Sequence, residues 1–267
     1  MSEITILLLY LLAAIAFAAS RLPRFAAYSN ASLIAAYGFS IAGLMIHGQF
    51  LNAEIKSPSG LILSVESTLS LVGLQLALIG LLGAIEPTLR GMTAGLLLLA
   101  ALATIPLGLQ PAVAESTELT WQLQAHILTS IFSYGLLTVG VIVAIFALVQ
   151  DSRLRSGKFS AANHLFAPLD TTEKLLFGVA AAGFVGLLLS VVSGFTFVED
   201  LFAQHLVHKT GLSLLALALF GILVGGRMFA GWRGKRAVYL YLGGFGALCL
   251  AYFGARLVLE LLGRSWS

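Results

Sequence analysis

The stretch WQLQAHILTSIFSYGLLTVGVIVAIFALVQ, residues 121–150, decides the fold. From Ile127 onward it has no charged residue until Asp151. Because an α-helix rises about 1.5 Å per residue, about 20 apolar residues cross the roughly 30 Å hydrocarbon core of a bilayer. The stretch therefore predicts a transmembrane helix, and it places His126 about one turn inside one end of that helix, near a membrane face.

The rest of the chain has the same apolar character. Of its 267 residues, 59% are hydrophobic and only 10% are charged, and its mean hydropathy is +0.97. This composition excludes a soluble globular domain, which needs a water-facing surface. The single cysteine, Cys249, excludes a disulfide framework, a CxxC redox pair and a cysteine-rich metal site. We therefore expect an all-α polytopic membrane bundle, with one integral membrane domain over 1–267.

Apolar runs of spanning length recur along the sequence and predict eight transmembrane helices. The first four form a four-helix N-terminal half, 4–119, and the other four form a C-terminal half, 120–267. The predicted spans cover about 4–20, 31–50, 61–84, 91–109, 122–150, 174–194, 207–230 and 238–262.

Basic residues are concentrated in alternate connections between these spans. Cytoplasmic connections of membrane proteins carry an excess of Lys and Arg, so this pattern predicts orientation. We expect the N-terminus and the C-terminus to lie outside. Eleven of the fifteen basic residues are then cytoplasmic: Arg21, Arg24, Arg90, Arg153, Arg155, Lys158, Lys174, Arg227, Arg233, Lys235 and Arg236.

Four of the five histidines converge on the outer face in this topology. His47 and His126 lie near the outer ends of the second and fifth spans, and His205 and His208 lie at the start of the seventh. Neutral imidazole is a common metal ligand, and haem iron takes axial histidines from opposite sides. A zinc site would need further close ligands, and the sequence has no HExxH or paired-Cys motif. The pattern leaves open a haem site or interfacial histidines that bond to water and headgroups.

Two further features lie at the same face. The connection GFTFVEDLFAQHLVHKT, 194–210, is apolar and aromatic, and it predicts a short interfacial helix between helices six and seven. Such a helix can receive the haem macrocycle or serve as an anchor without a ligand. Arg256 and Glu260, four apart on the last span, can pair with each other, or Arg256 can donate to a haem propionate.

Five stretches form ordered landmarks over about 120–267. Together they resemble the cytochrome c assembly membrane proteins related to CcsA and CcmC, and within them the short YpjD/HemX-like branch. Residues 1–119 fit this resemblance mainly in helix count and in His47. The stretches are HILTSIFSYGLLTVGVIVAIFAL after Trp121, LDTTEKLLFGVAAAGFVGLLLSVVSG at 169–194, HKTGLSLLALALFGILVGGR at 208–227, GWRGKRA at 231–237 and LAYFGARLVLE at 250–260.

The resemblance implies haem handling at the outer face of a bacterial inner membrane by a multi-pass protein. In the family, an external histidine that opens a helix and precedes small residues and an SY pattern ligates haem, and His126 occupies this position. The tryptophan-rich WWD segment is absent from 194–210, and no second external histidine follows the last helix, because the chain ends LLGRSWS. His205 or His208 can replace the missing ligand, and His47 can supply one from the other half.

We therefore predict a haem-binding protein of cytochrome c assembly or haem trafficking, and not an enzyme. It would hold haem b through iron ligation by His126 with His47, His205 or His208, and Arg256 would contact the cofactor. Its expected partners are haem, the lipid bilayer and other cytochrome c assembly components, with no nucleic acid.

Two other classes of function are alternatives to haem binding. The alternative is a membrane regulator or scaffold of haem biosynthesis or of a metal transporter, without bound haem, whose partners contact 151–173 and the GWRGKR turn at 231–236. A small-solute transporter is disfavoured, because the spans show no repeat and no charged pair at mid-bilayer depth.

Overall fold

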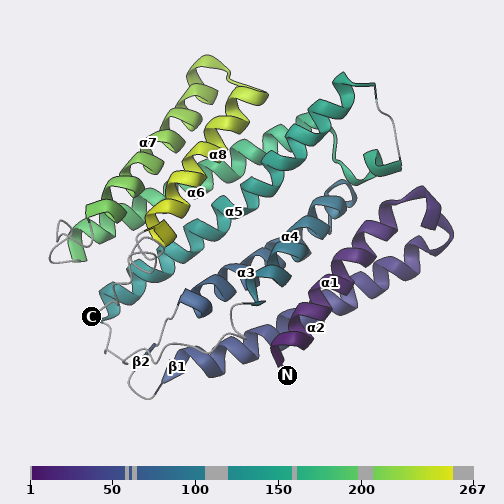
Figure 1. Ribbon diagram of the computed structural model, residues 1–267, viewed down its shortest axis with the longest axis horizontal. Coiled ribbons are helices and arrows are strands. Elements are labelled where there is room, and N and C mark those ends of the chain that lie inside the picture. The colour runs from purple at the N-terminus through teal and green to yellow at the C-terminus, as the bar shows by residue number, and fades with distance from the viewer. Residues whose placement is uncertain are drawn as a thin grey trace. The chain divides into compact units, whose positions relative to one another are not determined.

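The computed structural model describes residues 2–57, 60–61, 65–105, 120–157, 161–197 and 207–254. Within these ranges the chain folds into eight α-helices and one antiparallel pair of two-residue strands, β1 (Lys56–Ser57) and β2 (Gly60–Leu61) (Figure 1). The predicted all-α membrane bundle is confirmed. The helices are α1 (Ser2–Arg21), α2 (Ser29–Ile55), α3 (Val65–Gly83), α4 (Arg90–Ala103), α5 (Trp121–Arg155), α6 (Leu169–Phe197), α7 (Val207–Ala230) and α8 (Lys235–Cys249). Single turns accompany them: η1 (Pro23–Tyr28), η2 (Pro87–Leu89), η4 (Ala161–Leu165) and the π-helical η5 (Leu250–Gly254).

Six helices in the described ranges are long and apolar enough to cross a membrane. Helices can do so because they satisfy every backbone hydrogen bond internally, which the bilayer core requires. The shorter α4 and α8 occupy the places of the fourth and eighth predicted spans. Because α6 continues to Phe197 and α7 begins at Val207, the predicted interfacial helix could occupy only 198–206, which lies outside the described residues.

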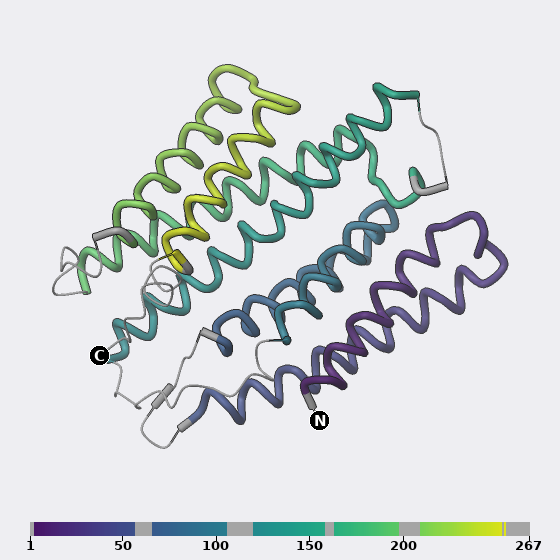
Figure 2. The backbone as a smooth tube through the Cα atoms, viewed as in Figure 1, coloured from purple at the N-terminus to yellow at the C-terminus, as the bar shows by residue number. Residues whose placement is uncertain are grey.

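The chain divides into two compact units. Unit 1 comprises Met1–Thr120 with Ile145–Thr172, and unit 2 comprises Trp121–Ala144 with Glu173–Ser267. The backbone trace in Figure 2 shows that α5 and α6 are continuous through the points where the division falls.

Small residues allow the helices of unit 1 to approach one another closely. In this unit α1 packs against α2 and α4, and α3 packs against α4. A Cβ atom on Gly43 of α2 would lie 2.8 Å from a ring carbon of Tyr10, and one on Gly73 of α3 would lie 2.9 Å from the Cβ of Ala103. Lipid tails are as apolar as leucine, so such close van der Waals packing is a main source of helix association in a membrane.

Two tyrosines bind α8 to α5 in unit 2. The hydroxyl of Tyr241 donates to the carbonyl of Leu137 at 2.8 Å, and the hydroxyl of Tyr134 donates to that of Leu248 at 2.8 Å. Tyr241 is fully buried, and its hydroxyl occupies the space that a side chain on Gly140 would need. Any side chain larger than that of glycine at position 140 would therefore clash with Tyr241.

Gly140→Ala is expected to destabilise unit 2 by about 1–3 kcal/mol, because the added methyl would displace the Tyr241 hydroxyl from its hydrogen bond. The measurement is the midpoint of thermal unfolding in detergent, followed by circular dichroism. Gly243→Ala in α8 is the matched control, because nothing lies within 4 Å of the position of its Cβ. Equal midpoints for the two variants would contradict this packing.

Candidate functional site

The N-terminal part of α5 and the C-terminal part of α6 pair in one antiparallel register within unit 2. Each step forward along α5 meets a step backward along α6. The steps are three or four residues, the spacings of one helix face, except for the last step on α5, which is five residues. None of these residues is charged. We call this series the α5–α6 seam: Leu137 with Gly183, Ser133 with Gly186, Ser130 with Ser190, His126 with Ser193, and Trp121 with Phe197.

Glycines make the deeper part of the seam possible. A Cβ atom on Gly183 would collide with the side chain of Leu137, and one on Gly186 would collide with the hydroxyl of Ser133. Leu137 and Ser133 are fully buried. The two helices are therefore close enough at this level for short side chains to meet, and the next pairs toward the helix ends are hydroxyls.

His126 lies on this seam, half-buried, with a defined hydrogen-bond partner. Its Nδ1 is 2.9 Å from Ser193 Oγ, and the Ser193 hydroxyl donates to the carbonyl of Ser190 at 2.9 Å. A serine hydroxyl has one proton, so an oxygen that already donates must accept from the imidazole. We infer that Nδ1 carries the ring proton, which leaves the lone pair on Nε2.

Three small residues hold the imidazole in place. A Cβ atom on Gly194 would lie 3.2 Å from Cε1 of His126, so the ring rests against the backbone of α6. The hydroxyl of Ser130 donates to the carbonyl of His126 at 2.7 Å and lies 2.6 Å from the hydroxyl of Ser190. The histidine is therefore fixed from both helices without any charged neighbour on the seam.

Aromatic side chains continue the seam beyond His126. The rings of Trp121 and Phe197 have centroids 6.5 Å apart. Both are exposed, Trp121 by 72% and Phe197 by 44%. Beside the imidazole, the ends of the two helices thus present an apolar aromatic surface that a flat, apolar ligand can contact.

His47 has a different environment, in unit 1. It is fully buried, with Nδ1 3.1 Å from the hydroxyl of Tyr10 and Nε2 2.7 Å from that of Ser70. Tyr10 also packs edge-on against the imidazole ring. Both nitrogens therefore have partners, and His47 joins α1, α2 and α3. Iron ligation by His47 stays a prediction, and it would require one of these hydrogen bonds to break.

The other predicted ligands are less fully described. His205 and Arg256 lie outside the described residues, and of His208 only the backbone, in the first turn of α7, is described. In the part of the chain that the structure describes, no three His, Cys, Asp or Glu side chains form a group that could hold a metal ion.

The sequence predicts His126 as a site residue, which stays a prediction, but the residues that surround it in the structure were not predicted. A signal was present, because Gly183, Gly186, Ser190 and Ser193 follow the 3-4-3 spacing of one helix face. That spacing indicates a close helix contact, but it does not say which helix is the partner.

The family model of the cytochrome c assembly protein matches residues 3–262. The chain belongs to this family. Inner membrane protein YpjD of Escherichia coli (strain K12) is 33% identical over 145 residues, which cover 54% of this chain and 55% of the relative. An uncharacterized 28.8 kDa protein in the nifR3-like 5′ region of Azospirillum brasilense is 26% identical over 154 residues, 57% of this chain and 56% of the relative.

The chain thus spans about half the length of the curated relatives it matches. No solved structure matches it. The predicted family and the predicted multi-pass inner-membrane location are confirmed. Membership of a haem-related family supports a role in cytochrome c biogenesis.

The Nδ1–H tautomer of His126 can be tested directly. With ¹⁵N-labelled histidine in the ligand-free protein, NMR should show a protonated Nδ1 and an unprotonated Nε2 for His126. Ser193→Ala removes the acceptor and should shift the population toward the Nε2–H form. Ser190→Ala should leave the tautomer unchanged, because the carbonyl that orients Ser193 remains. An Nε2–H tautomer in the unaltered protein would contradict the inferred geometry.

Proposed function

We propose that the chain binds haem b at the outer face of the inner membrane, with Nε2 of His126 as an axial ligand of the iron. Its role would be in cytochrome c assembly or haem trafficking, without an enzymatic reaction of its own. The observation that carries this proposal is the hydrogen bond between Nδ1 of His126 and Ser193 Oγ. Metal-ligating histidines almost always donate their other ring N–H to such a partner.

The surroundings of His126 also fit a haem ligand. The ring is neutral in the proposed tautomer, and the seam carries no charge that would compete for Nε2. Trp121 and Phe197 supply apolar area for the edge of a macrocycle. His126 would hold the iron, Ser193 would fix the ring orientation, and the aromatic residues would exclude water from the iron–nitrogen bond. Bound haem would supply the iron centre.

The second axial ligand is proposed to come from His205 or His208. Both nitrogens of His47 already have hydrogen-bond partners, so ligation by His47 would also cost the contacts that join three helices. Arg256 is proposed to contact a propionate, since a guanidinium can bind a carboxylate through two parallel hydrogen bonds. Other cytochrome c assembly components are proposed as partners that deliver or receive haem.

Absorption spectra of the detergent-purified protein, as isolated and after haem addition, test this function. We expect a low-spin bis-histidine spectrum. His126→Ala should abolish it, as should alanine at one of His205 and His208. Ser193→Ala should weaken haem binding by about tenfold, the usual effect of removing a partner of a metal ligand.

His164→Ala is the matched control, because this exposed histidine belongs to unit 1, whereas the seam belongs to unit 2. It should keep the full spectrum. If the protein takes up no haem under any of these conditions, the haem proposal is wrong, and the regulator or scaffold alternative takes its place.

A further inference from the structure

The turn between α7 and α8 is held in one conformation by its own backbone. Gly231 and Gly234 adopt positive φ angles of 62° and 65°, which favour glycine. Between them, the N–H of Trp232 donates to the carbonyl of Gly226 at 3.1 Å, and Arg227 donates to the carbonyl of Trp232 at 3.1 Å. The chain therefore reverses direction through a tight, internally bonded turn.

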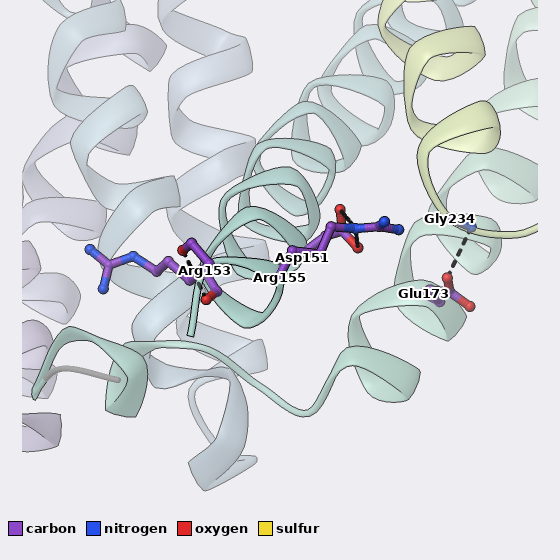
Figure 3. Close-up of polar contacts among 6 residues, drawn as sticks. Asp151, Arg153, Arg155, Glu173 and Gly234 are labelled. Atoms are coloured by element: carbon purple, nitrogen blue, oxygen red, sulfur yellow. Dashed lines mark hydrogen bonds and ion pairs between the residues drawn. The ribbon is translucent and has the colours of Figure 1, made fainter. Parts of the chain in front are cut away.

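Side chains from the turn itself, from α8 and from α6 stabilise this conformation. The indole ring of Trp232 lies against Gly226, where a Cβ atom would collide with it. The guanidinium of Arg236 stacks over the indole, 3.8 Å from the ring centroid. From α6, a carboxylate oxygen of Glu173 accepts the N–H of Gly234 at 3.0 Å (Figure 3). The backbone N–H at the start of α8 thus already has an anionic partner.

Arg233 and Arg236 differ from most of the described arginines in their partners. Both are exposed, and neither guanidinium has a hydrogen-bond acceptor in the parts of the chain that the structure describes. Among the other described arginines, Arg24 stacks over the ring of Phe25, and five bind acceptors within the protein, as Figure 3 shows for the ion pair of Arg155 with Asp151. They are Arg21 with the His164 carbonyl, Arg90 with the Ala84 carbonyl, Arg153 with Asn163 Oδ1, Arg155 with Asp151, and Arg227 with the Trp232 carbonyl.

Large exposed apolar side chains flank this turn in the sequence. Phe229 is 89% exposed and Met228 is 72% exposed, both at the end of α7. The apolar span of this helix ends at Ala230, so they lie at the boundary of the hydrocarbon core. Tyr239, 61% exposed, lies one turn into α8. The turn therefore places apolar area and two guanidinium groups at one depth.

We propose that this turn binds the phosphate of an anionic phospholipid through Arg233 and Arg236. A guanidinium stacked on an indole keeps its N–H edge available, and that edge matches phosphate oxygens in a two-bond geometry. Because Trp232 already restricts Arg236, less side-chain entropy is lost on binding. Phe229 contacts the acyl chains below the headgroup, and tryptophan is typical of this depth. The basic connections predict the cytoplasmic leaflet, whose anionic lipids attract such residues.

Quenching of Trp232 by brominated lipids tests the site. In a Trp121→Phe, Trp266→Phe background, Trp232 is the remaining tryptophan. The protein is reconstituted in bilayers that contain either acyl-brominated phosphatidylglycerol or acyl-brominated phosphatidylcholine. We expect phosphatidylglycerol to quench at a lower mole fraction. Arg233→Gln and Arg236→Gln should each reduce this preference about fivefold, the factor equivalent to ~1 kcal/mol per basic residue.

The matched control is Arg24→Gln or Arg155→Gln, each of which removes the same single charge from an exposed arginine of unit 1. Each should keep the preference, and circular dichroism should show every variant folded. Equal quenching by the two lipids, or an equal loss in the control, would overturn the proposal. Release of the lipid by excess inorganic phosphate at matched ionic strength would assign the site to free phosphate instead.

Discussion

The hydrogen bond from Nδ1 of His126 to Ser193 is the contact on which the proposed site depends. It exists because α5 and α6 approach closely along a series of small residues, with glycines at the deeper end and hydroxyls at the shallower end. In a membrane, a polar group between helices must find its partner in the protein. The seam serines therefore form hydrogen bonds with one another or with helix carbonyls, and these bonds fix the orientation of the imidazole. They are Ser130, Ser190 and Ser193.

The requirement for partners within the protein gives His47 a different environment from that of His126. In unit 1, His47 is enclosed by Tyr10 and Ser70, so that both of its nitrogens are used in joining helices. In unit 2, one nitrogen of His126 has a partner among the described residues, and the exposed Trp121 and Phe197 are the next pair along the seam. A buried histidine with two partners stabilises packing, whereas a half-buried histidine with one partner keeps a lone pair for a ligand.

The fold could be predicted from the sequence because a bilayer leaves the chain few choices. A run of apolar residues must be a helix there, so eight runs gave eight helices in the described ranges, with errors chiefly at their ends. The sequence predicted His126 as a site residue from the depth of the outer histidines and from the resemblance to a family, and its role as a ligand stays a prediction. The partners Ser193, Tyr10 and Ser70 come from other helices, and spacing within one helix does not reveal which neighbour it meets. His205 and Arg256 lie outside the described residues, so their roles stay predictions.

The most direct test of the central claim is a cryo-electron microscopy map of the haem-loaded protein in a lipid bilayer. The account predicts density for the iron continuous with Nε2 of His126, while Nδ1 stays within hydrogen-bonding distance of Ser193. Trp121 and Phe197 should contact the macrocycle. Haem bound elsewhere in the chain, or iron bonded to Nδ1 with Ser193 displaced, would contradict the account.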